Sequence, residues 1–272
     1  MKSTVAELLK LRFLPVAILW SNEKPEKALQ FVPGRRGCLM SLFAQAALGK
    51  TAVIDRETFG CYGGGVGAGF GNQFEHSPGG MEQFRHFLSN GILNCKTPGD
   101  FDDIVEKTTR PEQRAHLLHG ERYRKTPELV DSFIKNLPIT DIPATYVIFK
   151  PVSTLNRDEI PKVVVFCGNP HQVSALVTLV HYRRPGVDSV IIPASAGCHQ
   201  IMLFPYRESE CEDQRAVLGL TDPSARKEVM RVLGDDAMTF AVPWKMFLEM
   251  EEDAPVSFLS GSTWGAIRER LE

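Results

Sequence analysis

Two stretches of this chain repeat one order of predicted elements, and each ends in the dipeptide Gly-Cys. The first lies between Leu14 and Cys61, and the second lies between Lys162 and Cys198. In each stretch an apolar run suited to a buried strand is followed by an apolar helical pattern and then by a second apolar run. Alternation of strands and helices is typical of α/β proteins. We therefore predict two pseudo-repeated β-α-β halves, about residues 14–71 and 162–202, that share a mixed central sheet.

Between the two halves the sequence changes to short helical patterns separated by prolines. The predicted helices cover Met81 to Leu88, Phe101 to Lys107, Glu112 to Leu118 and Glu128 to Leu137. Because no linker-like change in composition accompanies them, we interpret residues 79–137 as a helical insertion into a single α/β domain of residues 1–272. After the second half, further strands are predicted at Val217 to Leu220 and Thr239 to Val242, with helices at Ser224 to Leu233, Trp244 to Met250 and Thr263 to Leu271.

Composition and charge exclude several classes of protein. With 43% hydrophobic residues in 272, the chain can bury a large core. Its net charge of -2 does not favour nucleic-acid binding, which needs clustered basic residues in excess. Charged residues interrupt the N-terminal apolar segment, and no apolar run is long enough for a membrane span. We therefore expect a cytoplasmic protein whose six cysteines are thiols or metal ligands rather than a disulfide framework.

Three cysteines follow a glycine directly and are the best candidates for metal ligands. Cys38 is expected in the first turn of a helix, where the helix dipole favours a thiolate. Cys61 and Cys198 are expected at equivalent strand ends if a pseudo-twofold axis relates the halves, and open α/β sheets bind ligands at such ends. Three thiolates suit an iron-sulfur cluster or zinc. A fourth ligand would come from a histidine, a small molecule, Cys95, Cys167 or Cys211, and the alternative for each cysteine is ordinary burial in the core.

A glycine-rich segment follows Cys61, with seven glycines between Gly60 and Gly71. Such a run is a poor candidate for a regular helix or strand, so we predict a loop that brings its backbone close to a ligand. The residues assigned to cofactor binding are Gly63, Gly64, Gly65, Gly67, Arg35 and Arg36, the arginines because they could clamp a carboxylate or phosphate. The dinucleotide fingerprint G-x-G-x-x-G is absent. A tight turn and an exposed basic pair are the alternatives.

In order along the chain, these features resemble the uncharacterised family named domain of unknown function 169. The resemblance is carried by Cys38, by Gly60-Cys61 with the glycines from Gly63 to Gly69, by Asn169-Pro170 with Gln172, and by Gly197-Cys198. It covers the chain from about Leu14 to the last helix and implies no established reaction. Similar proteins are found in many anaerobic bacteria and archaea, which suits an oxygen-sensitive cofactor. Residues 81–137 and the C-terminal end depart from the pattern.

The leading hypothesis is a cofactor-binding protein that holds an iron-sulfur cluster, or another thiolate-ligated metal, between its two halves. A redox partner or a small-molecule ligand would then be its partner. Two alternatives stay open. One is a metal-free binding module for a small anionic or nucleotide-like ligand, and the other is a thiol enzyme that uses Cys38 as its nucleophile. The sequence leaves the reaction and the oligomeric state undetermined.

Overall fold

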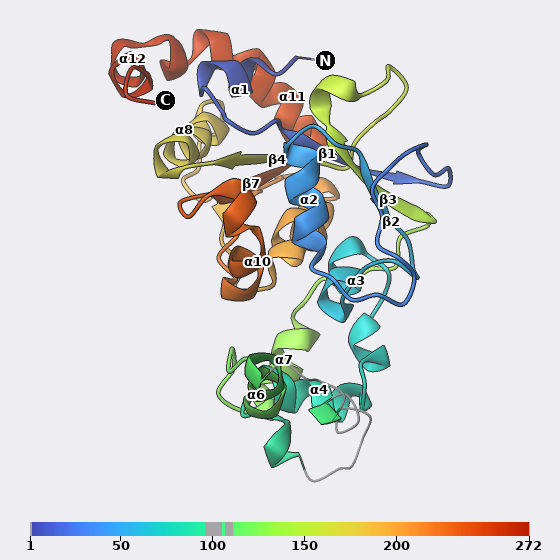
Figure 1. The fold of residues 1–272 in the computed structure, drawn as a ribbon. Helices are drawn as coiled ribbons and strands as arrows, with labels where there is room; N and C mark the ends of the chain where they lie inside the picture. Colours follow the sequence, from blue (N-terminus) through green and yellow to red (C-terminus); the bar gives the residue numbers. More distant parts are fainter. Residues whose placement is uncertain (1, 96–104, 107–110, 272) are drawn as a thin grey trace. The chain divides into compact units, whose positions relative to one another are not determined.

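The computed structural model describes residues 2–95, 105–106 and 111–271 and divides the chain into two compact units (Figure 1). The larger unit contains Met1–Gly71 and Thr140–Glu272, and we call it the sheet unit. The smaller unit, Asn72–Ile139, is built from helices, and we call it the helical unit. No helix of the described residues has the length and apolarity that crossing a membrane would require.

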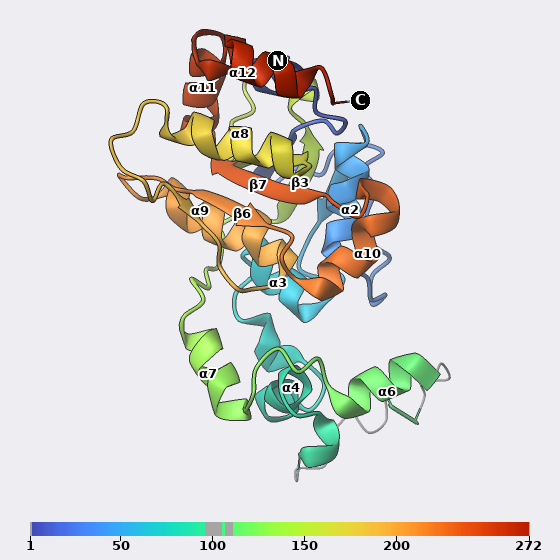
Figure 2. The ribbon, with the colours of Figure 1, turned by 90° about the vertical axis from the view of Figure 1, so that its left-hand side faces the viewer.

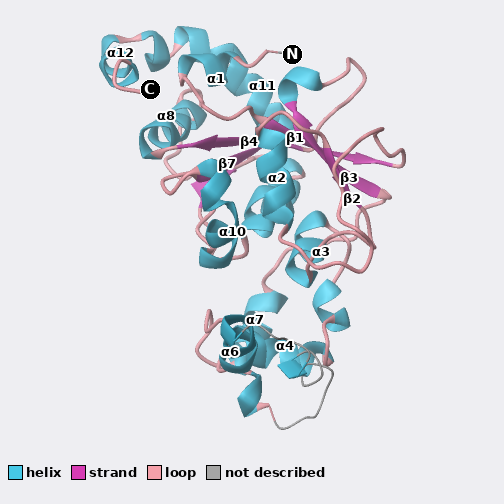
Figure 3. Ribbon diagram, in the orientation of Figure 1, coloured by secondary structure: helices cyan, strands magenta, loops and turns pink. Residues whose placement is uncertain are grey.

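The sheet unit is built around one seven-stranded mixed sheet with the strand order β2-β3-β1-β4-β7-β6-β5 (Figure 3). Its strands are β1 (Val16–Ser21), β2 (Ala52–Ile54), β3 (Tyr146–Pro151), β4 (Val163–Gly168), β5 (Val190–Ile191), β6 (Ala216–Gly219) and β7 (Met238–Pro243). Only the pair β5 and β6 is parallel among these neighbours. The predicted α/β class with a mixed central sheet is confirmed.

Both faces of this sheet are covered by helices, so its central strands alternate between two cores. In β1, Val16 and Ile18 point into the first core, whereas Ala17 and Leu19 point into the second. Figure 2 shows α3, α9 and α10 on one side of the strands and α8, α11 and α12 on the other.

The helices on the first face are α2 (Leu39–Ala47), α3 (Tyr62–Ala68), the π-helix η4 (His199–Leu203) with α9 (Phe204–Ser209), and α10 (Pro223–Leu233). The second face carries α1 (Thr4–Leu8), α8 (Pro170–His181), α11 (Trp244–Asp253) and α12 (Ser262–Arg268). The remaining short elements of the sheet unit are the 3-10 turns η3 (Val152–Thr154), η5 (Ala254–Val256) and η6 (Phe258–Ser260).

The structure does not confirm that the two β-α-β segments form a pseudo-repeat. The crossover helices α2 and α8 cover opposite faces of the sheet. In addition, β1 and β4 are antiparallel neighbours, with Val16 opposite Val165 and Ile18 opposite Val163. Since β2 runs parallel to β1 and β5 runs parallel to β4, the strands β2 and β5 point in opposite directions. The carboxyl ends of β2 and β5 therefore point in opposite directions along the strands, so they do not meet on one side of the sheet.

The chain leaves and re-enters the sheet unit through two segments that are hydrogen-bonded to each other. The amide of Gly71 donates to the carbonyl of Thr140 at 3.0 Å, and the amide of Ile142 donates to the carbonyl of Gly69 at 2.8 Å. The residues of the helical unit lie between them, so this unit interrupts the larger one at a single place along the chain.

The helical unit contains η1 (Gln73–His76), α4 (Gly80–Leu88), η2 (Ile92–Asn94), α6 (Pro111–His119) and α7 (Pro127–Lys135). The rings of Phe74 and Phe84 stack with their centroids 4.4 Å apart, and Arg85 of α4 forms an ion pair with Asp131 of α7 at 2.9 Å. Three of the predicted helices are confirmed as α4, α6 and α7. The fourth, residues 101–107, lies outside the described residues except for 105–106, which are helical.

Candidate functional site

Three cysteines of the sheet unit stand at the starts of three helices that pack on the same face of the sheet. Cys38 is the N-cap of α2, Cys61 is the N-cap of α3, and Cys198 directly precedes η4. The expected helix start at Cys38 is confirmed. The expected strand ends at Cys61 and Cys198 are wrong, because β2 ends at Ile54 and β5 ends at Ile191, several residues earlier.

Backbone contacts bring these three helix starts together. The amide of Gly37 donates to the carbonyl of Gly60 at 3.3 Å, which joins the residues that precede Cys38 and Cys61. At the start of η4, the Cys198 thiol donates to the carbonyl of Gly63 in α3 at 3.2 Å. The three cysteines are thus neighbours in the folded protein, although the two halves of the sequence are not related by the expected symmetry.

The glycine-rich segment is a helix, not the predicted loop. Residues Tyr62–Ala68 form α3, and Gly69 ends it in the left-handed conformation at φ +86°. The low helix propensity of glycine is overridden by packing. A Cβ atom at Gly67 would lie 3.0 to 3.1 Å from atoms of Cys198, and one at Gly64 would lie 2.7 Å from the carbonyl oxygen of Phe59. These glycines therefore let α3 approach neighbouring backbone, which is a different role from cradling a ligand.

Burial and the neighbouring sulfurs keep the Cys38 and Cys198 thiols protonated when nothing is bound to them. Burial, and then the neighbouring Cys61, raise the pKa of Cys38 to about 12. Burial raises the pKa of Cys198 well above its usual range, with further contributions from Cys61 and Cys38. The helix start does not lower the pKa of Cys38 as the sequence suggested, because the loss of hydration outweighs the helix dipole. These shifts also place the three sulfurs within electrostatic range of one another.

Cys61 differs from the other two because it is exposed to solvent. Its sulfur accepts a hydrogen bond from the amide of Gly64 at 3.2 Å. Cys38 is half-buried and Cys198 is buried, so the group extends from the surface into the first core.

His199 is a buried neutral residue beside this group. Its ring Nε2 lies 3.0 Å from the carbonyl oxygen of Gly63, and its Nδ1 lies 2.7 Å from the Ser195 hydroxyl oxygen. A carbonyl can only accept, so Nε2 carries the hydrogen and Nδ1 accepts from the hydroxyl. Burial lowers the pKa of His199 to about 4. The imidazole therefore supports the Gly63 carbonyl that also receives the Cys198 thiol.

The remaining residues assigned to cofactor binding are divided between surface and interior. Gly63 and Gly65 lie within α3, and a Cβ atom at Gly63 would meet nothing within 4 Å. Both arginines are exposed. The guanidinium of Arg36 lies 5.7 Å from the ring centroid of Tyr62, the first residue of α3, whereas the backbone of Arg35 closes a turn on the carbonyl of Val32. The structure thus brings Arg36 to the helix that follows Cys61.

The three other cysteines lie in separate places. Cys167 is buried in β4, as its apolar sequence context predicted, and burial raises the pKa of its thiol to about 12. Cys211 is exposed, and its thiol donates to the carbonyl of Arg207 at 3.4 Å. Cys95 lies in the helical unit.

Cys95 belongs to a second group of metal-binding residue types that the sequence analysis missed. Its sulfur and ligand atoms of Glu82 and His86 all lie within 4.8 Å of one another. The available signal was the i, i+4 spacing of Glu82 and His86, which places both on one face of a helix. Among the residues that the structure describes, this is the group of three His, Cys, Asp or Glu residues whose ligand atoms all lie within 4.8 Å of one another.

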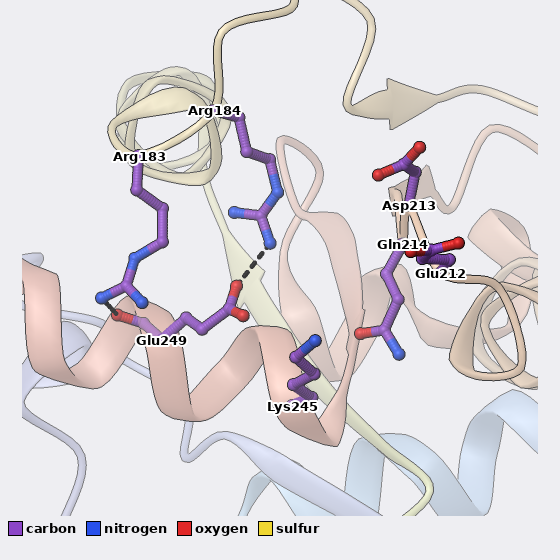
Figure 4. A pocket seen from close by; sticks show the side chains of 7 residues that line it. All are labelled: Arg183, Arg184, Glu212, Asp213, Gln214, Lys245 and Glu249. Carbon is purple, nitrogen blue, oxygen red and sulfur yellow. Dashed lines mark hydrogen bonds and ion pairs between the residues drawn. The ribbon is translucent and has the colours of Figure 1, made fainter.

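A pocket of about 210 Å³ lies elsewhere in the sheet unit and is lined by charged side chains (Figure 4). Arg184 pairs there with Glu249, and Arg183 donates to the carboxylate of Asp253 outside the pocket lining. The charges of Arg183 and Arg184 are therefore neutralised by Asp253 and Glu249, two carboxylates of α11. No cysteine lines this pocket, and we assign it no ligand.

The model of one protein family matches residues 4–253, and this family is described as domain of unknown function 169, uncharacterised ArCR. A search of curated proteins found no match. A search of solved structures also found none.

Proposed function

The chain belongs to the family of domain of unknown function 169, and we propose that it holds a thiolate-ligated metal centre, an iron-sulfur cluster, on Cys38, Cys61 and Cys198. One observation carries this proposal. Three thiols from distant segments converge at three helix starts, where the Cys61 sulfur raises the pKa of both Cys38 and Cys198. Buried cysteines that serve only as core residues do not need to be neighbours.

The raised pKa values of Cys38 and Cys198 explain why positive charge from a bound metal would stabilise these sulfurs as thiolates. Thiolates at Cys38 and Cys198 would be poorly hydrated and would repel the Cys61 sulfur, so the metal-free protein holds these two residues as thiols. Iron ions supply positive charge at the same place and displace the protons. The centre would then be held as three thiolates whose mutual repulsion is offset by the metal.

Spacing favours a cluster over a single ion. Two sulfur ligands of one tetrahedral zinc ion lie about 3.8 Å apart, given zinc-sulfur bonds of about 2.3 Å. Among the described residues, the three thiols do not form a group with all ligand atoms within 4.8 Å. A cluster places several iron ions between its cysteines and therefore accommodates a wider separation. The fourth ligand of the cluster would be either a further side chain or a small molecule.

Nearby groups would stabilise such a centre. The Gly64 amide already donates to the Cys61 sulfur, and hydrogen bonds of this kind tune the potential of a cluster. Arg36, held over Tyr62, adds a positive charge near the start of α3. The thiol-enzyme alternative is less well supported, because a nucleophilic cysteine needs a lowered pKa and that of Cys38 is raised to about 12.

The test is anaerobic reconstitution of the full chain with ferrous iron and sulfide, followed by visible absorption and analysis of iron, zinc and sulfide. Cys61→Ser and Cys211→Ser form a matched pair, since both replace an exposed cysteine. We expect Cys61→Ser to lose the cluster and Cys211→Ser to keep it. Equal iron and sulfide content in the two variants would overturn the proposal. Wild-type protein that takes up no metal would favour the metal-free module for an anionic ligand.

A further inference from the structure

We infer that the helical unit contains a second and independent metal site, which binds a zinc-type divalent ion through Glu82, His86 and Cys95. The three ligand atoms lie within 4.8 Å of one another. Glu82 and His86 project from the same face of α4, with Oε1 and Nε2 3.7 Å apart. Cys95 directly follows η2, so the chain turns back to place its sulfur beside these two side chains.

The histidine is already oriented as a metal ligand. Its Nδ1 lies 2.8 Å from the side-chain oxygen Oδ1 of Asn90. Because an amide oxygen can only accept, Nδ1 carries the hydrogen and the lone pair of Nε2 faces Glu82. A hydrogen bond to the ring nitrogen that is not bound to the metal is the usual way in which proteins fix the tautomer of a ligating histidine.

The glutamate is also held in place by groups outside the site. Its Oε2 is paired with Arg85 at 2.5 Å, while Oε1 faces His86. The guanidinium of Arg85 is shared with Asp131 of α7 at 2.9 Å. One carboxylate oxygen therefore anchors the side chain and the other remains directed toward the ion, and Asp131 offsets part of the positive charge of Arg85.

The donor set identifies the class of ion. A thiolate, an imidazole and one carboxylate oxygen suit zinc, whereas calcium and magnesium prefer oxygen ligands alone. Nitrogen and oxygen ligands of one tetrahedral zinc ion lie about 3.3 Å apart, so the observed separation needs only a small contraction on binding. Three protein ligands leave one coordination position for water or for another small ligand.

The position of the site suggests what the ion does for the protein. It would connect α4 to the segment after η2 within a unit of residues 72–139. Units of about this size bury a smaller fraction of their surface than larger domains do, and metals are among the usual means of stabilising them. The ion would thus stabilise the helical unit itself, independently of the thiols of the sheet unit.

The experiment uses the full chain and cobalt as a spectroscopic probe, with zinc added afterwards as competitor. Thiolate-bound cobalt absorbs in the visible and near-ultraviolet ranges, so its spectrum reports on the sulfur ligand. We expect Cys95→Ser and His86→Gln to bind one equivalent less cobalt than wild type. Cys211→Ser and Glu75→Gln, which replace residues of the same types outside the site, should bind as wild type does. Circular dichroism of the metal-free variants shows whether each is folded.

A second set of variants separates this site from the proposed cluster. Cys61→Ser should keep the cobalt equivalent that Cys95→Ser loses, and Cys95→Ser should keep the iron and sulfide that Cys61→Ser loses. Cobalt binding that is unaffected by Cys95→Ser and His86→Gln would overturn the inference. It would also be overturned if the cobalt spectrum disappeared in Cys61→Ser alone, since the ion would then occupy the thiols of the sheet unit.

Discussion

The sheet unit and the helical unit assemble their groups of metal-binding residues in opposite ways. The sheet unit takes Cys38, Cys61 and Cys198 from three distant segments and places them at helix starts, in positions that range from exposed to buried. The helical unit takes Glu82 and His86 from one helix and Cys95 from the turn that follows it.

This difference has physical consequences for the two groups. Distant thiols depend on the close packing of α3 against the segment of Cys198, so the first group exists only when the sheet unit is folded. Neighbours on one helix are close whenever that helix forms. The first group should therefore be sensitive to packing changes, whereas the second should respond mainly to changes in its own side chains.

The largest effect is expected for Gly67→Val. A Cβ atom at this position would lie 3.0 to 3.1 Å from the backbone and Cβ of Cys198, and valine adds two further methyl groups. Overpacking of this kind costs roughly 3 kcal/mol and would move the Cys198 segment away from α3. We expect loss of iron and sulfide together with a lower free energy of unfolding in urea.

The control for this variant is Gly63→Ala in the same helix, where the added Cβ meets nothing within 4 Å. It should retain the metal and should be no less stable than wild type, because alanine has the higher helix propensity. If Gly63→Ala emptied the site while Gly67→Val did not, the close packing of α3 and Cys198 would not be what assembles the thiols.

Acid should destabilise the sheet unit through His199. Its pKa is about 4 in the folded protein against 6.5 when unperturbed, so the unfolded chain binds the extra proton between these values. Stability is therefore complete above pH 6.5 and falls as the pH decreases toward 4, by about 3 kcal/mol in all.

The measurement is urea unfolding at a series of pH values, followed by tryptophan fluorescence. All three tryptophans, Trp20, Trp244 and Trp264, belong to the sheet unit, so the signal reports on that unit. His199→Gln should lose most of this pH dependence, since glutamine does not titrate. A wild-type curve that is flat from pH 6.5 to 4 would contradict the neutral buried imidazole.

A smaller effect on stability is expected for a change at Cys167, and it distinguishes this core cysteine from the proposed metal ligands. Cys167→Ser places a hydroxyl group in β4, where the side chain is 1% exposed, and should cost about 1 to 2 kcal/mol of stability. It should leave iron and sulfide content unchanged. Cys198→Ser, also at a buried position, should lose the cluster instead. The opposite pattern in metal analysis would show that the wrong buried cysteine had been assigned.

The smallest effect concerns the residue that orients the histidine of the helical unit. Asn90→Ala removes the acceptor of the His86 Nδ1 hydrogen bond without removing a metal ligand. Loss of such a partner weakens metal binding by about tenfold or somewhat more. Competition between cobalt and a chelator measures this change, and Asn136→Ala, at the C-cap of α7, serves as the control. Equal affinities would indicate that Asn90 does not orient the ligand.

Local sequence signals predicted most of the elements of the sheet unit. The apolar runs became β1 and β4, and the strands predicted after Cys198 became β6 and β7. At the start of α8, Asn169 and Gln172 form a reciprocal capping box and Pro170 is the first helical residue, and both are local features of the sequence. These signals succeed because caps and apolar periodicity act over a few residues. The low helix propensity of glycine failed as a signal at α3 because packing against Cys198, which is distant along the chain, selects the helix there.

The sequence by itself determined the α/β class, the inserted helices and the helix start at Cys38, since each depends on neighbouring residues. Only the tertiary structure decided that β1 and β4 are antiparallel neighbours and that α2 and α8 lie on opposite faces. It also decided that the three cysteines are neighbours and that burial raises the pKa of Cys38 and Cys198. Strand order and the loss of hydration depend on which distant segments pack together, and no local pattern in the chain specifies that packing.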